Sequence, residues 1–203
     1  MPTPPGARTS TSTARNRDPI LSVLQSRLPA HGLALEIAAG AGEHSVYFAA
    51  AFPALKWQPT DADPEALASI AAWRGHAGLP NLLPPLPLNA SDPNSWPVSR
   101  ADAIVNINMI HISPWAATQG LMEGASRRLP AGGALFLYGP FIEHDVETAP
   151  SNLGFDLSLK ARNPAWGIRH LDDVSALATD HGLRLTERIE MPANNLTVIF
   201  RKV

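Results

Sequence analysis

The sequence predicts an α/β protein with a Rossmann-like, doubly wound, seven-stranded sheet that is mostly parallel and ends in an antiparallel hairpin. Two observations carry this expectation. Short apolar segments typical of strands alternate with longer segments typical of helices, which is the order of a parallel sheet covered by helices on both faces. The last two strand-like segments follow each other directly, as an antiparallel pair does.

The first elements surround a glycine turn. Apolar residues at helical spacing predict a helix over residues 18–28, with Asp18 as its N-cap and Pro19 at its first position. A short apolar strand is expected at 33–38. The glycines that follow it lead into a helix at 43–52.

A second strand and helix follow the first pair. The strand is expected at 55–61 and the helix at 64–73, with Asp63 as its cap. Prolines interrupt the third strand candidate, residues 81–88, and limit its hydrogen bonding.

The second half continues the alternation. A fourth strand is expected at 101–110, a helix at 114–129 that ends before Pro130, and a strongly apolar fifth strand at 133–141. Residues 142–170 show no clean period and are expected to form an insertion or lid.

The chain closes with a helix at 171–182 and a hairpin of strands at 184–191 and 194–202. At the other end, residues 1–14 are rich in Pro, Ser and Thr and are expected to be a disordered tail. Residues 15–203 then form a single domain.

Composition limits the functional classes. The 203 residues are 45% hydrophobic and 17% charged, with a formal charge of −2 and no cysteine. This balance gives no electrostatic reason to expect nucleic acid or membrane as a partner. Neither a thiolate metal site nor a cysteine nucleophile is available, and the histidines lack paired ligand spacing, so no metal is expected.

The glycine turn favours a cationic ligand. Gly40 and Gly42 lie at the carboxyl end of the first strand, where doubly wound sheets bind ligands. A dinucleotide fingerprint needs a third glycine, but Ser45 occupies that position. Glu36 and Glu43 flank the turn, and their charges suit a sulfonium or ammonium group better than a diphosphate. Glycine turns of this kind serve both nicotinamide and S-adenosylmethionine, and the carboxylates favour the second.

Asp61 follows the second strand, and a carboxylate there accepts hydrogen bonds from the ribose hydroxyls of an adenosyl group. Both cofactors contain that group, so Asp61 does not choose between them. The alternative role for Asp61 is a turn residue or helix cap, although Asp63 is the better cap by position.

The pattern E-x-A-x-G-x-G, formed by Glu36, Ala38, Gly40 and Gly42, resembles motif I of class I S-adenosylmethionine-dependent methyltransferases. Further segments resemble the DUF938 group, which includes the vertebrate methyltransferase-like 26 proteins. The resemblance spans nearly the whole chain from Ala14 onward. Its segments are RNRDPI, LEIAAGAGEHSVYFA, WQPTD, NMIHISPW, LFLYGPF, SNLGFD, WGIR and EMPANNL.

The resemblance implies the class I methyltransferase fold and S-adenosylmethionine as cofactor. Gly40 and Gly42 would line its methionine part and Asp61 would hold its ribose. Asn89 occupies the position of an Asp that contacts the adenine amino group in many members. Asn106 matches the position that faces the methionyl group.

Three residues near strand ends are candidates for chemistry. His111 is the best-placed base because its ordinary pKa is near neutrality, and its alternative role is to anchor the turn before Pro114. Asn108 and Tyr138 are placed to orient a polar acceptor or to satisfy backbone groups.

The irregular segment 142–170 supplies candidates for substrate binding, because loops over strand ends often contact substrate. They are Asn152 in SNLGFD, and Trp166 and Arg169 in WGIR. Trp166 has an alternative role as a core anchor. Before the first helix, residues 15–17 are either a cap over the cofactor or a solvated basic end.

Together these observations predict an S-adenosylmethionine-dependent methyltransferase that acts on an unidentified small-molecule acceptor. The alternative is a non-catalytic S-adenosylmethionine-binding protein that acts as a sensor or assembly element. A nicotinamide-dependent oxidoreductase is disfavoured by the missing third glycine. We expect a cytoplasmic monomer or homodimer without nucleic-acid or membrane partners.

Overall fold

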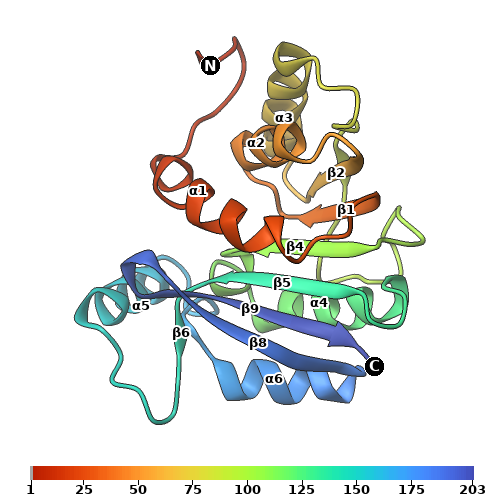
Figure 1. The fold of residues 1–203 in the computed structure, drawn as a ribbon. Helices are drawn as coiled ribbons and strands as arrows, with labels where there is room; N and C mark the ends of the chain where they lie inside the picture. Colours follow the sequence, from red (N-terminus) through yellow and green to blue (C-terminus); the bar gives the residue numbers. More distant parts are fainter. Residues whose placement is uncertain (1) are drawn as a thin grey trace.

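The structure is a computed structural model that describes residues 2–203 (Figure 1). Met1, the first residue of the segment expected to be disordered, lies outside the described residues. A seven-stranded sheet with helices on both faces forms the body of the protein, which confirms the predicted fold class.

Strands from both halves of the chain make up this sheet. They are β1 (Gly32–Ile37), β2 (Leu55–Asp61), β3 (Leu86–Pro87), β4 (Ala103–Ile107), β5 (Ala134–Gly139), β8 (Leu183–Met191) and β9 (Asn195–Lys202). Their order is β3-β2-β1-β4-β5-β9-β8. The first five are parallel, and β9 runs antiparallel to both β5 and β8, as predicted. A separate small pair joins β6 (Phe141–Ile142) to β7 (Arg169–His170).

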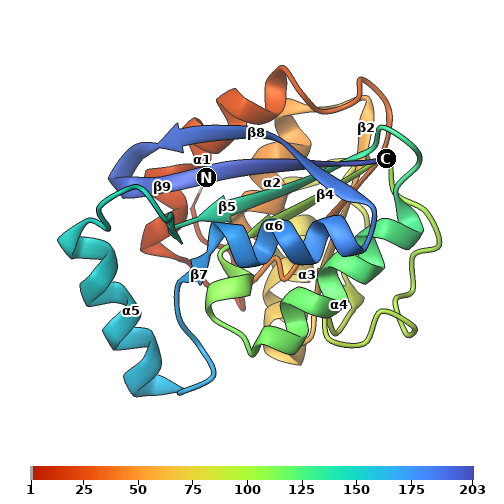
Figure 2. The same cartoon turned by 90° about the horizontal axis from the view of Figure 1, so that it is seen from below.

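Helices cover the two faces unequally. They are α1 (Thr11–Gln25), α2 (Glu43–Ala51), α3 (Pro64–Ala77), α4 (Trp115–Arg128), α5 (Pro150–Arg162) and α6 (Leu171–Asp180), with the short 3-10 turns η1 (Met109–His111) and η2 (Pro192–Asn194). Apolar side chains of α1, α2 and α3 share one core with the sheet, and those of α4 and α6 share the other. Figure 2 shows α5 standing at one end of the molecule, apart from both layers.

The strand order reverses between β1 and β4. The chain leaves β1 toward β2 and β3 on one side, and returns to β4 and β5 on the other. Such a switch point opens a crevice at the carboxyl ends of the strands, between connections that diverge. The glycine turn after β1 lies at this crevice.

The first helix differs from its prediction. It begins at Thr11 instead of Asp18 and takes in the last residues of the segment expected to be disordered. Pro19 lies inside the helix, where it removes one hydrogen bond instead of starting the helix. Thr13 and Asn16 are buried, so tertiary contacts stabilise an N-terminal part that has no apolar pattern.

Two further predictions need correction. Residues 142–170 are not irregular throughout, because α5 occupies thirteen of them. The buried residues of α5 are Asn152, Asp156 and Leu159. Because two of them are polar, the buried face lacks the row of apolar residues at helical spacing that would have predicted this helix. The strand expected at 81–88 shrinks to β3, with an isolated bridge from Leu82 to Trp57.

Candidate functional site

The chain reverses direction between β1 and α2 through residues with positive φ. This angle is 57° at Ala38, 59° at Gly40 and 91° at Gly42. A Cβ atom on Gly42 would lie 2.9 Å from the Cα atom of Ile70 in α3, so glycine alone fits there. A Cβ atom on Gly40 would meet nothing within 4 Å, which leaves this backbone open to a ligand.

A cavity of about 330 Å³ lies over this turn. Its walls come from the turn itself, the ends of β1, β2 and β4, and the start of α1. Five of the residues predicted to bind the cofactor line it together, namely Glu36, Ala38, Gly40, Gly42 and Asp61. Ser10, Ser12, Thr13, Glu43, His44 and Asn108 add further polar groups to its wall.

Glu36 is the most deeply buried acid of this cavity, with 2% of its surface exposed. Its Oε2 atom accepts hydrogen bonds from Ser45 Oγ at 2.6 Å and Trp57 Nε1 at 2.7 Å. Burial raises the pKa of Glu36 to about 7, and these two hydrogen bonds oppose that rise. Ser45, whose position argues against a dinucleotide motif, therefore serves to hold this carboxyl group.

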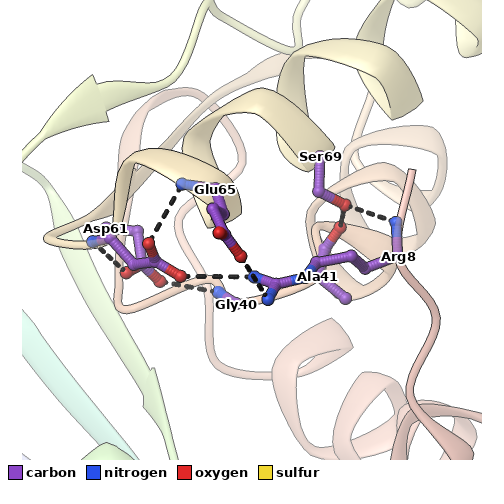
Figure 3. A network of polar contacts seen from close by, with 7 residues as sticks. Arg8, Gly40, Ala41, Asp61, Glu65 and Ser69 are labelled. Carbon is purple, nitrogen blue, oxygen red and sulfur yellow. Dashed lines mark hydrogen bonds and ion pairs between the residues drawn. The ribbon is translucent and has the colours of Figure 1, made fainter. Parts of the chain in front are cut away.

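Asp61 ties β2 to the glycine turn. Its Oδ2 atom accepts a hydrogen bond from the Gly40 amide at 2.9 Å, and Oδ1 accepts one from the Asp63 amide at 2.9 Å (Figure 3). A carboxylate offers about four acceptor positions, so each oxygen retains capacity for a ligand. Asp63 caps α3 through the Glu65 amide, which leaves Asp61 facing the cavity as expected.

The N-terminal segment crosses the turn from outside. The Arg8 amide donates to Ser69 Oγ at 2.8 Å, and that hydroxyl donates to the Ala41 carbonyl at 2.7 Å. The Arg8 guanidinium pairs with Asp63 at 3.2 Å and with Glu65 at 2.8 Å (Figure 3). These exposed ion pairs contribute little energy each, but together with the backbone contacts they fix the path of the segment.

A second cavity of about 560 Å³ adjoins the first. Ser12 and Asn108 line both, so the two cavities meet at these side chains. Asn108 has φ 63° directly after β4, and its amide donates to the Tyr138 carbonyl at 2.8 Å. Tyr138 and Asn152 also line the second cavity. Three of the residues predicted for catalysis or substrate binding therefore gather here.

Sequence reasoning missed a buried polar pair between the cavities. Asn16 Oδ1 and His44 Nε2 lie 2.8 Å apart, with Asn16 in the wall of the second cavity and His44 in the wall of the first. Burial lowers the pKa of His44 to about 4, so the ring is neutral and donates to Asn16. Burial raises the pKa of Tyr138, and the nearby Asn16 side chain opposes that rise. Asn16 lies in RNRDPI and His44 in LEIAAGAGEHSVYFA, but nothing in these segments indicates that the two side chains pair.

His111 does not line either cavity. It is completely buried, its ring packs edge-on against Phe141, and its Nδ1 atom accepts a long hydrogen bond of 3.4 Å from the Arg169 amide. Burial, together with the nearby Arg169 charge, lowers the pKa of His111 to about 3. This environment fits the structural alternative better than the role of a base.

Two predicted cofactor contacts also lie elsewhere. Asn89 is exposed, and its Oδ1 atom accepts a hydrogen bond from the Ser91 amide at 3.0 Å within its own turn. Asn106 is buried inside the sheet, where its Nδ2 atom donates to the Ile37 carbonyl at 2.9 Å. Neither lines the first cavity, because Ile107 and Asn108 extend from β4 in that direction instead.

Arg169 from WGIR stabilises the turn after β4, and Trp166 packs against α5. The Arg169 guanidinium donates to the carbonyls of Ile110 at 2.9 Å and Ser113 at 2.6 Å, and it lies over the ring of Trp115. Trp166 packs under Arg162, 5.0 Å from its guanidinium carbon. Both residues lie outside the two cavities.

Residues 2–203 contain no group of three or more His, Cys, Asp or Glu residues that could hold a metal ion. Within the same described residues, no helix has the length and apolar character needed to cross a membrane.

Solved structures resemble this fold over most of its length. An O-methyltransferase family protein from Burkholderia thailandensis aligns with a TM-score of 0.79 at 16% identity, over 94% of this chain and 57% of that chain. An O-methyltransferase family 2 protein from Planctomyces limnophilus, solved with apigenin, gives 0.77 at 20% identity, over 95% and 60%. Human N-acetylserotonin methyltransferase, solved with S-adenosylmethionine, gives 0.76 at 16%, over 94% and 52%. At such identities the likeness establishes the fold alone, and this chain spans little more than half of each relative.

One family model matches the sequence itself. It is described as a protein of unknown function, DUF938, and it matches residues 7–202.

Proposed function

Since the chain belongs to the DUF938 family and has the fold of class I methyltransferases, we propose that it is an S-adenosylmethionine-dependent methyltransferase with a small-molecule acceptor. Its kinship with the methyltransferase-like 26 proteins belongs to the same proposal and depends on the motifs alone.

The meeting of two cavities at Asn108 and Ser12 is the observation that supports this function most directly. A methyl donor and an acceptor must lie in adjoining sites, with the reacting atoms in line and water excluded. The first cavity would hold the donor and the second would hold the acceptor. Asn108 stands at the boundary, where its amide group orients a polar acceptor atom.

The residues of the first cavity fit the cofactor. Glu36, Glu43 and Asp61 surround it with carboxyl groups, which suit the sulfonium and ammonium charges. Gly40 offers open backbone, and the remaining acceptor positions of Asp61 suit ribose hydroxyls. When bound, S-adenosylmethionine supplies a methyl group on a positively charged sulfur that departs as a neutral thioether.

Among the described residues, the wall of the second cavity contains no carboxylate and no histidine that could act as a base. Tyr138 and Arg15 are the titratable residues among those described in the wall of the second cavity, and burial raises the pKa of Tyr138. Tyr138 is therefore a hydrogen-bond donor there. We infer that the acceptor atom has lost its proton to solvent before the methyl transfer, as the oxyanion of an acidic hydroxyl has, and that His111 takes no part in proton transfer.

The same absence of a base favours the alternative of a non-catalytic S-adenosylmethionine-binding protein, which needs none. Turnover separates the two. Methyl transfer from labelled S-adenosylmethionine to any component of a small-molecule extract would exclude the alternative.

Calorimetric titration with S-adenosylmethionine, S-adenosylhomocysteine and NADH tests the proposal. We expect the two adenosyl ligands to bind and NADH not to bind. Asp61→Asn should weaken adenosyl binding by about tenfold or more, because it removes a charged acceptor of hydrogen bonds. Asp63→Asn is the matched control, since Asp63 lies two residues away and outside the cavity wall. Equal losses in both variants, or binding of NADH alone, would refute the proposal.

A further inference from the structure

We propose that the second cavity selects an acceptor with a ring-sized apolar body and an anionic group, such as an aromatic carboxylic acid, and that Arg15 binds the anion. This inference rests on the proposed methyltransferase function and names the class of acceptor.

Charge distribution is the first argument. Arg15 is the one charged side chain among the described residues that line the second cavity. Asn16, Asn108, Asn152 and Asn195 contribute neutral polar groups, and none of the described lining residues is an acid. An anionic ligand therefore meets one attractive charge and no repulsive one within this wall.

Arg15 is also unpaired. In the part of the chain that the structure describes, its guanidinium makes no ion pair and no hydrogen bond. Arg17, two residues along α1, is by contrast engaged: it lies 3.6 Å from Asp18 and over the ring of Tyr47. Burial raises the pKa of Tyr138 in this wall, and the charge of Arg15 is close enough to oppose that rise.

The apolar part of the wall suits a flat ring. Pro19, Pro140 and Pro192 present rigid apolar faces, and Phe155 adds an aromatic one. A volume of about 560 Å³ lies within the ordinary range for small-molecule sites, which is about 300–1,000 Å³. A ring between these faces would carry its reacting atom toward Asn108 and its anionic group toward Arg15.

The charges of the first cavity also favour an anionic acceptor in the second cavity. Glu36, Glu43 and Asp61 attract a cation to the first cavity and repel an anion from it. A cation-attracting site beside an anion-attracting site sorts the two substrates into their own positions. A neutral acceptor would gain nothing from this division.

The test measures binding to full-length protein saturated with S-adenosylhomocysteine. The probes are 4-hydroxybenzoate and 4-hydroxycinnamate, each compared with its neutral amide by calorimetry. We expect each acid to bind about tenfold more tightly than its amide. Arg15→Gln should abolish that preference, whereas Arg17→Gln, the matched control on the same helix, should retain it.

Each outcome has a definite meaning. Acids and amides that bind equally, or that both fail to bind while S-adenosylhomocysteine binds, would overturn the inference and leave the methyltransferase proposal standing. An equal loss in Arg17→Gln would also overturn it, because a general change of surface charge would then explain the effect. Failure of S-adenosylhomocysteine itself to bind would instead refute the proposed function and the inference with it.

Discussion

Binding of S-adenosylmethionine should depend on pH through Glu36. Burial raises the pKa of this carboxyl group to about 7, so it is neutral in half of the molecules at that pH. A bound sulfonium stabilises the ionised form, and binding therefore releases a proton. Because the ionised form is the one that attracts the ligand, affinity should fall as the pH drops below about 7.

The size of the effect follows from the ionised fraction. With a pKa of about 7, roughly one molecule in eleven carries an ionised Glu36 at pH 6, and about ten in eleven do at pH 8. If the ligand binds only the ionised form, its apparent Kd improves by about tenfold across this interval. The pKa of His44 is lowered to about 4, so its titration lies outside the interval.

Calorimetry at three pH values, each in two buffers of different ionisation enthalpy, measures both the Kd and the protons released. Glu36→Gln keeps an oxygen that accepts from Ser45 and Trp57 but carries no charge. This variant should bind more weakly at pH 8 and lose most of the pH dependence. S-adenosylhomocysteine, which lacks the sulfonium charge, should show a smaller dependence in the wild type. An unchanged pH profile in Glu36→Gln would refute the reasoning.

Two further predictions concern stability. Burial lowers the pKa of His111 to about 3, so the folded protein should lose about 2 kcal/mol from this residue between about pH 7.5 and pH 5, as the unfolded chain takes up a proton. The free energy of unfolding of His111→Asn, measured by chemical denaturation, should not show this loss. A kcat close to that of the wild type, under conditions in which the variant is fully folded, would support a structural role. Gly42→Ala should destabilise by about 2–3 kcal/mol, because its φ of 91° and its 2.9 Å approach to Ile70 both exclude a Cβ atom. Gly40→Ala should cost about 1 kcal/mol in denaturant melts, since only its φ of 59° is unfavourable; equal costs for the two variants would contradict this account.

Most of the fold could be predicted from the sequence, because the apolar runs and the turn residues indicate the same element bounds along most of the chain. The bounds of β2 match the expected residues 55–61, and Asp63 caps α3 as expected. The sequence did not predict the start of α1 or the helix α5, because the buried side chains of these segments are mostly polar. Asn16 in α1 and Asn152 in α5 face the interior, and a hydrophobic pattern contains no signal for such residues.

The predicted site residues also fall into two groups, those that line the first cavity and those that are buried in the protein. Glu36, Gly40 and Asp61 lie where the strand ends and the turn put them, so their gathering follows from local backbone geometry. His111 and Asn106 also stand near strand ends, but side-chain packing turns them into the protein. In β4 both faces are buried, so the alternation of the sequence does not tell which side chain meets the ligand.

The N-terminal segment is ordered by polar contacts and contributes to the walls of both cavities. Composition marks it as a tail, yet Arg8 holds its path across the glycine turn, Ser12 lines both cavities and Arg15 faces the second one. A segment with few apolar groups gains its order from hydrogen bonds and ion pairs, and its partners are Glu43 in the wall of the first cavity and Asp63 and Glu65 at the start of α3. Order in this segment and charge in the site are therefore coupled. Glu43, one of the carboxylates that would attract the cationic cofactor, also holds the start of the helix that carries Arg15.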